Sequence, residues 1–246
     1  GDGWMLECIR KYGTETTYFG INAGTLGFLM NSNSNLPLII KSLQERSWIE
    51  HSFPLLHVSG RSIHGNQING NALNDIYVAR VGGVAANLRI DIDNVNIVEK
   101  LVCDGLIVAS ALGSTAYSAS AGGSPSHPLL SGMHITPICA HTPRLRPFII
   151  PDKAKVNISV LYPDRRRVQA VGDGFSFGEV HDVTSDQRSR FLQRRATYPR
   201  RPHLIGPHHL KLVYIHRVDL RQRREPFRFI AAGIREPIGT VLLIGE

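Results

Sequence analysis

The stretch from Asp104 to Gly123 constrains this chain more than any other part of its sequence. It reads DGLIVASALGSTAYSASAGG, and its first half, Leu106 to Ala109, is an apolar run rich in branched side chains. Asp104-Gly105 precedes this run and Gly113 follows it. A short apolar run bounded by turn residues predicts a buried strand. We therefore expect a strand here that delivers the chain to the following loop.

The loop from Gly113 to Ser118 combines small residues and hydroxyls with one aromatic side chain, Tyr117. Small side chains let backbone amides approach a ligand, hydroxyls donate to its oxygens, and a tyrosine covers a flat ring. This composition predicts a ligand-binding loop. An ordinary helix start, with Ser or Thr as its N-cap, explains the same residues equally well.

Other motifs precede and follow this stretch in a fixed order. The chain opens with GDGWML, INAGTLGFLMN covers Ile21 to Asn31, ALND covers Ala72 to Asp75, and HPLL covers His127 to Leu130. Together these segments resemble the NAD kinase family, which carries Gly-Gly-Asp-Gly, N-x-G-x-L-G-F-L, an Asn-Glu pair and D-G-L-I-V…G-S-T-A-Y-S-x-S-A-G-G. The resemblance covers about the first two-thirds of the chain, and the long last motif is its most specific part.

The resemblance implies an enzyme that transfers the γ-phosphate of ATP to the 2′-hydroxyl of the adenosine ribose of NAD. Asp2 would take the hydroxyl proton, since the flanking glycines leave its carboxylate accessible, although an Asp-Gly turn is the competing interpretation. Asn74 and Asp75 resemble the pair that holds the ribose. Magnesium, or another divalent cation, would accompany ATP, and the sequence nominates no metal ligands.

The remaining positions that the resemblance assigns to NAD binding lie in three motifs. They are Gly3, Phe28, Leu29, Asp104, Thr115, Ala116, Tyr117 and Ser120. Gly24 and Gly27 are candidates for a phosphate-facing loop, with plain turn glycines as the alternative.

The sequence predicts a mixed fold, α/β plus all-β. We expect residues 1–50 to be the remnant of a doubly wound α/β domain whose first units are missing, with a helix from Leu36 to Ser47. Residues 51–186 alternate in short runs such as Leu88 to Ile92 and Lys155 to Tyr162, which predicts a β-rich, sandwich-like NAD-binding domain. Residues 187–246 form a basic tail for which the sequence predicts no fold.

Composition adds expectations about the partners and location of the protein. The net charge of +8 lies in the tail, where thirteen basic residues follow Gln187 and only four acidic ones do. Aromatic side chains are too sparse there for a base-stacking surface, so we expect no nucleic-acid partner. No apolar run of eighteen residues and no leader are found, and three widely spaced cysteines indicate reduced thiols, so we expect a cytoplasmic protein without a membrane partner. The family resemblance implies a homodimer or homotetramer.

Four positions depart from the family pattern. They are Trp4 after Gly-Asp-Gly, Asp75 in place of glutamate, Asn87 near a position that is commonly basic, and Phe175 in place of the glutamine of Asp-Gly-Gln. Two alternatives therefore stay open: a degenerate homologue that binds NAD without catalysis, and a lipid or sugar kinase that shares Gly-Asp-Gly. The sequence does not decide between ATP and polyphosphate as donor, or between NAD and NADH as acceptor.

Overall fold

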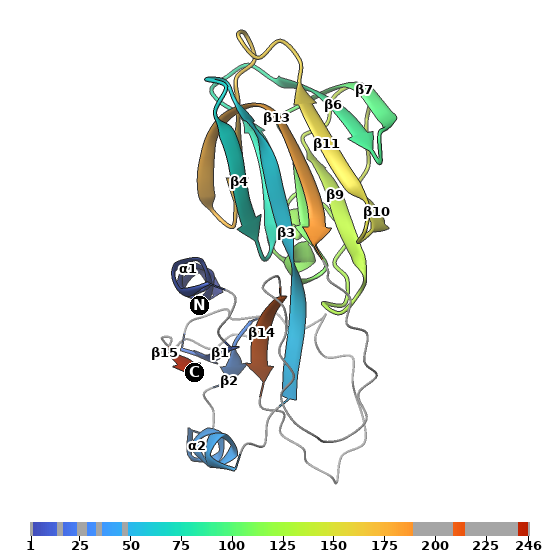
Figure 1. Ribbon diagram of the computed structural model, residues 1–246. Helices are drawn as coiled ribbons and strands as arrows, with labels where there is room; N and C mark the ends of the chain where they lie inside the picture. Colours follow the sequence, from blue (N-terminus) through green and yellow to red (C-terminus); the bar gives the residue numbers. More distant parts are fainter. Residues whose placement is uncertain are drawn as a thin grey trace. The chain divides into compact units, whose positions relative to one another are not determined.

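The computed structural model describes residues 2–13, 17–23, 29–32, 36–45, 49–188, 209–214 and 241–245 (Figure 1). The chain divides into two compact units. Unit 1 comprises residues 1–53 and 203–246, and unit 2 comprises residues 54–202. We describe each unit by itself.

Strand β1 (Thr17–Asn22) is central to unit 1. It pairs in parallel with β14 (His209–Tyr214) and with the short β2 (Asn31–Ser32), and antiparallel with β15 (Val241–Gly245). The basic segment at the end of the sequence therefore supplies two strands that pair with β1. Local sequence does not reveal this pairing, because strand partners are chosen by tertiary contacts.

Two helices contact opposite faces of β1 (Figure 1). Helix α1 (Asp2–Tyr12) buries Met5, whose terminal methyl lies 2.6 Å from the position that a β-carbon on Gly20 would take. Helix α2 (Leu36–Gln44) packs Ile39 against Phe19 and Ile21. Successive side chains of a strand point to opposite faces, so helices on both sides bury the four inner residues of β1, whereas Thr17 and Asn22 stay half-buried. A strand covered by helices on both faces is the arrangement that the prediction of a doubly wound α/β layer calls for.

Unit 2 is built from antiparallel strands, and β3 (Ile49–Ser62) enters it from unit 1. One sheet has the order β10-β9-β8-β5-β12-β13, and the other joins β4, β3, β13, β11, β6 and β7. The further strands are β4 (Gln67–Ala72), β5 (Asp75–Arg80), β6 (Ala86–Ile92), β7 (Val95–Cys103), β8 (Gly105–Ser110), β9 (Gly132–Ile138), β10 (Phe148–Pro151), β11 (Lys155–Val160), β12 (Val168–Gly172) and β13 (Phe175–Arg188). The strands predicted from alternation, β6 and β11, are confirmed.

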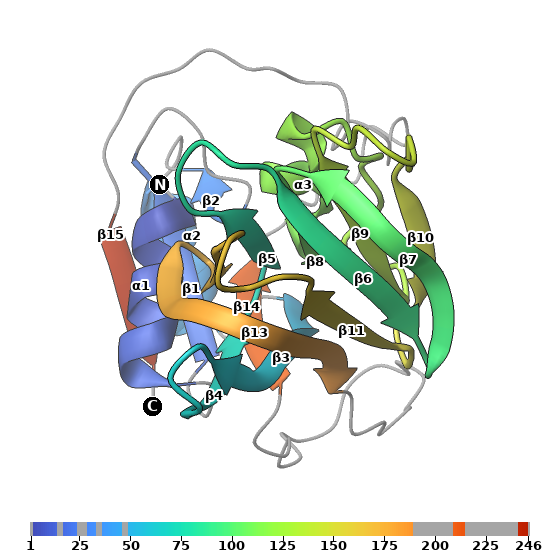
Figure 2. The same ribbon diagram turned by 90° about the horizontal axis from the view of Figure 1, so that it is seen from above.

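Strand β13 joins the two sheets by curving from one to the other (Figures 1 and 2). Its first residues pair with β12, its later residues pair with β3 and β11, and its register shifts between Val180 and Asp182. Such a bulge adds bend and twist to a strand. Side chains of both sheets then form one core, including Val58 and Ile158 from one sheet and Val78 and Leu106 from the other. The predicted sandwich-like fold is confirmed.

The central strand β8 is buried at every position from Gly105 to Ser110, as its apolar run predicts. Burial leaves no room for a side chain at Gly105, where a β-carbon would lie 2.2 Å from the carbonyl oxygen of Val78.

Among the described residues, no helix is long and apolar enough to cross a membrane.

Candidate functional site

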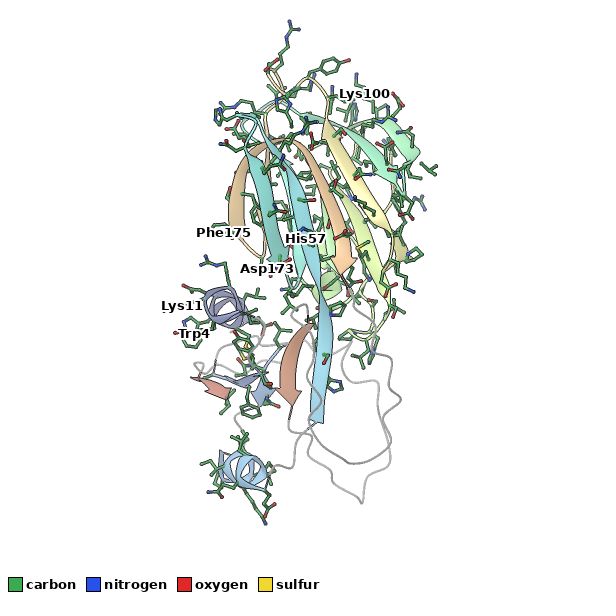
Figure 3. The ribbon with its side chains drawn as sticks, in the orientation of Figure 1. Trp4, Lys11, His57, Lys100, Asp173 and Phe175 are labelled. Atoms are coloured by element: carbon green, nitrogen blue, oxygen red, sulfur yellow. The ribbon has the colours of Figure 1, made fainter. Side chains whose placement is uncertain are left out.

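Three segments that carry predicted or polar site residues meet at one end of a sheet in unit 2. Strand β5 begins at Asp75, which pairs with Ala109 near the end of β8. Gly172, the last residue of β12, pairs with Ile76 of β5. The turn after β12 brings Asp173 to the same end of the sheet. Figure 3 labels Asp173 close to the point where β4 ends. Antiparallel pairing therefore gathers the start of β5, the end of β8 and the β12–β13 turn.

The Asn74-Asp75 pair lies at the centre of this end. Asn74 is half-buried, whereas Asp75 is only 5% exposed. Burial, and to a lesser extent the charge of the nearby Asp173, together raise the pKa of Asp75 from its ordinary 3.8 to about 7. Desolvation and a like charge both favour the protonated carboxyl. Asp75 therefore titrates close to neutral pH, which is a property often found in functional sites.

The segment after β8 is helical rather than an open loop, and this corrects the first expectation. A 3₁₀ helix η1 (Leu112–Thr115) is followed by one turn of α-helix, α3 (Tyr117–Ser120). Neither begins with a side-chain cap, and the residue before α3 is Ala116. The predicted Ser or Thr cap is therefore wrong as well, because the hydroxyls bond elsewhere in the fold.

Two of the three loop hydroxyls are used inside the protein. The Ser114 side chain is fully buried and accepts a hydrogen bond from the backbone N–H of Ser126 at 2.9 Å. The Ser118 hydroxyl is also fully buried and lies 2.8 Å from that of Thr136. The Ser114 hydroxyl thus ties η1 to the segment before β9, and the Ser118 hydroxyl ties α3 to β9 itself. Thr115 stays half-buried, with its hydroxyl 3.5 Å from the Leu112 carbonyl oxygen.

Tyr117 presents its ring at the surface of this end of unit 2. It is 38% exposed and meets the Tyr77 ring edge-to-face, with centroids 5.0 Å apart. The pKa of Tyr117 is raised, first by burial and then by the charges of Asp75 and, more weakly, Cys139 and Asp104. The charges of Asp75 and Asp104 therefore both reach Tyr117, although Asp104 precedes β8 and lies at the opposite end of that strand from the residues that pair with Asp75. An exposed aromatic face beside carboxylates suits a nucleoside, whose base stacks while its hydroxyls bond.

Asp104 stands between β7 and β8 and has a partner that the sequence did not indicate. The Arg80 guanidinium donates from Nε to Asp104 Oδ1 at 2.5 Å, and both side chains are about one-third exposed. This ion pair fixes the orientation of the Asp104 carboxylate at the surface. Of the other predicted residues, Ala116 is half-buried and Ser120 is exposed at the end of α3.

The remaining described site residues belong to unit 1. The Asp2 carboxylate lies at the N-terminus of α1 and accepts a hydrogen bond from the Leu29 backbone N–H at 3.0 Å. The Leu29 side chain is buried, and among the described residues outside α1 no atom lies within 4 Å of the position that a β-carbon on Gly3 would take. The backbone of Leu29 thus helps to orient the Asp2 carboxylate. Gly24, Gly27 and Phe28 lie outside the described residues.

Two residues have a structural part in this site although the sequence assigned them no role there. The Asp173 carboxylate accepts backbone N–H groups of the Asn74 segment, and the Ser110 hydroxyl donates to the carbonyl oxygen of Leu73 at 2.6 Å. An Asp-Gly pair between two alternating runs signals the turn at Asp173. No sequence signal places that turn beside Asn74. Among the described residues, no group of three or more His, Cys, Asp and Glu gathers as a metal site.

Comparisons with known proteins indicate the family of this chain. The family model described as ATP-NAD kinase C-terminal domain matches residues 73–189. NAD kinase of Zymomonas mobilis is 33% identical over 233 residues, which cover 93% of this chain and 83% of the relative. NAD kinase of Rhizobium meliloti is 35% identical over 204 residues, which cover 81% of this chain and 77% of the relative.

Two solved structures are also similar to this chain. The structure of an Archaeoglobus fulgidus NAD kinase in complex with ATP is similar at a TM-score of 0.65 and 28% identity, covering 78% of this chain and 72% of that one. Yeast NADH kinase complexed with NADH shares the fold at a TM-score of 0.66 and 24% identity, covering 80% of this chain and 53% of that one. The matched stretches include both the Asn74 segment and the strand-η1-α3 segment, and we conclude that this chain belongs to the NAD kinase family.

Proposed function

We propose that this chain transfers the γ-phosphoryl group of ATP to the 2′-hydroxyl of the adenosine ribose of NAD, forming NADP. The observation that carries the proposal is the meeting of Asn74, Asp75 and Tyr117 at one end of unit 2 in a member of the NAD kinase family. The ring of Tyr117 covers a base, while the amide of Asn74 and the carboxyl of Asp75 hold ribose hydroxyls. In this proposal Asp104, Thr115, Ala116 and Ser120 also contact NAD, as do Gly3, Phe28 and Leu29.

In the proposed reaction, Asp2 is the general base. Its carboxylate accepts the proton of the 2′-hydroxyl as the ribose oxygen bonds to the γ-phosphorus, and the bond to the bridging oxygen of ADP breaks. The hydrogen bond from the Leu29 backbone N–H helps to orient this carboxylate. Holding base and acceptor in line supplies much of the rate acceleration.

A divalent cation, most simply Mg²⁺, accompanies ATP in this proposal. Hard oxygen ligands suit it, and we expect the phosphates of the nucleotide to supply most of them. When bound, the cation neutralises charge on the transferred phosphate. Gly24 and Gly27 are proposed to shape the loop that faces these phosphates.

The proposal also places the enzyme in a homodimer or homotetramer, since closed symmetric assemblies are the commonest state of such enzymes. Light scattering at micromolar concentration tests this, and the mass of a single 27.2 kDa chain would contradict it.

The three cysteines are all free thiols, which is consistent with the proposed cytoplasmic location.

The activity is tested by incubating the protein with NAD, ATP and magnesium and detecting NADP with an NADP-specific dehydrogenase. Asp2→Asn keeps the size of the side chain and removes the proton acceptor, so kcat should fall by about 10² to 10⁴ while NAD affinity changes little. Near-normal turnover combined with lost binding would make Asp2 a ligand and Asp75 the next candidate base. NAD binding by calorimetry without NADP formation would instead favour the non-catalytic alternative.

A further inference from the structure

Three consecutive backbone amides in unit 2 point at one carboxylate. The N–H of Leu73 donates to Asp173 Oδ2 at 2.6 Å, and the N–H groups of Asn74 and Asp75 donate to Oδ1 at 2.8 and 3.3 Å. A carboxylate that accepts several N–H groups forms charge-assisted hydrogen bonds, which are the strong ones. These bonds hold Asn74 and Asp75 just where β5 begins.

The Asp173 backbone completes the contact from its own side. Its N–H donates to the carbonyl oxygen of Asp75 at 3.1 Å. Its φ of 46° is left-handed, a conformation that aspartate tolerates better than most residues, and Gly174 continues the turn at φ 80°. The turn between β12 and β13 is therefore shaped to present this carboxylate to a segment 98 residues earlier in the chain.

The opposite side of the Asn74 segment is fastened to the start of η1. The Ser110 N–H donates to the carbonyl oxygen of Asn74 at 2.8 Å, and the Ser110 hydroxyl bonds both the Leu73 carbonyl oxygen and the N–H of Gly113. A β-carbon on Gly113 would lie 2.0 Å from that Asn74 oxygen. The Asn74 segment is thus clamped between Asp173 and the segment that leads to Thr115 and Tyr117.

We propose that Asp173 is a positioning residue for NAD binding: it fixes the backbone of residues 73–75 and thereby sets where the side chains of Asn74 and Asp75 meet the ribose. This inference rests on the proposed function and adds a residue that acts through its neighbours. Polar groups that are held before the ligand arrives lose less entropy on binding. Asp173 therefore contributes to NAD affinity, and ATP affinity is independent of it.

The test compares Asp173→Asn with a matched control, Asp93→Asn. Asparagine tolerates the left-handed turn but turns an NH₂ group toward the amide donors, so the clamp loses at least one bond. Asp93 is also left-handed, at φ 50°, and also accepts a backbone N–H, that of Lys155 at 2.8 Å, in the β6–β7 hairpin. The two variants thus make the same change in equivalent turns.

We expect amide hydrogen exchange of residues 73–75 to become about tenfold faster in Asp173→Asn, with a KM for NAD raised about tenfold, equivalent to about 1.4 kcal/mol, and an unchanged KM for ATP. Asp93→Asn should change none of these. Should Asp173→Asn fail to fold, Ser110→Ala loosens the same segment from its other side and should raise the KM for NAD selectively.

Two results would overturn the inference. Unchanged exchange at residues 73–75 would mean that Asp173 does not hold the segment. Faster exchange with an unaltered KM for NAD, or with equal rises for NAD and ATP, would reduce Asp173 to a structural role. A wild-type protein that binds NAD in calorimetry but forms no NADP would count against the proposed function alone, because the Kd of NAD then replaces KM in the comparison.

Discussion

The buried carboxyl of Asp75 should make the stability of unit 2 depend on pH in a way that one substitution removes. Folding raises the pKa of Asp75 from 3.8 to about 7, so in this window the folded protein holds a proton that the unfolded chain has released. Stability therefore falls as pH rises from about 4 to about 7. The Asp75→Asn variant has no titrating group at position 75, so it should not show this loss of stability.

The size of the effect follows from the shift. Each pKa unit corresponds to about 1.4 kcal/mol, so the whole shift corresponds to about 4 kcal/mol. About 2 kcal/mol of this falls between pH 5.5 and pH 8. For a chain of this size, 1 kcal/mol moves Tm by about 2–4 °C, so the wild type should lose about 4–8 °C more than Asp75→Asn between these pH values.

Thermal unfolding followed by far-ultraviolet circular dichroism measures this difference, since most described strands lie in unit 2. Asp91→Asn is the control. Arg89 lowers the pKa of Asp91, so the stabilisation that the ionised Asp91 carboxylate gives to the folded wild type is already complete at pH 5.5. The variant lacks this stabilisation equally at both pH values. Equal shifts of Tm with pH in the wild type and in Asp75→Asn would refute the reasoning, because Asp75 would then be ionised in the folded protein throughout.

Two further substitutions test the geometry of the site. Gly113→Ala should cost about 1–3 kcal/mol and raise the KM for NAD, because its β-carbon would meet the Asn74 carbonyl, whereas Gly83→Ala points into open space and should change stability by less than about 0.5 kcal/mol in urea unfolding. Arg80→Met should weaken NAD binding in calorimetry by releasing Asp104, while Arg89→Met, which breaks the ion pair with Asp91 in the β6–β7 hairpin, should leave the Kd of NAD unchanged.

Much of the fold could be predicted because its patterns are local. An all-apolar run predicts a buried strand at β8, and alternating side chains predict strands at β6 and β11, since strand periodicity is set by the backbone itself. Inference from local composition failed for two hydroxyls within residues 113–118, those of Ser114 and Ser118. Their hydroxyls were interpreted as ligand donors or as a helix cap, yet Ser114 and Ser118 bond to groups further along the chain. A hydroxyl looks the same in a sequence whether its partner is a ligand or the protein.

The sequence alone determined which residue types this protein offers for chemistry: Asp2 between glycines, the Asn74-Asp75 pair, and Tyr117 after a run of small residues. Only the tertiary structure decided how those side chains behave. Asp75 titrates near neutral pH because β5 buries it and because the β12–β13 turn brings Asp173 beside it. Hydrogen-bond partners and dielectric environment are set by segments about a hundred residues apart, and chain proximity carries no information about them.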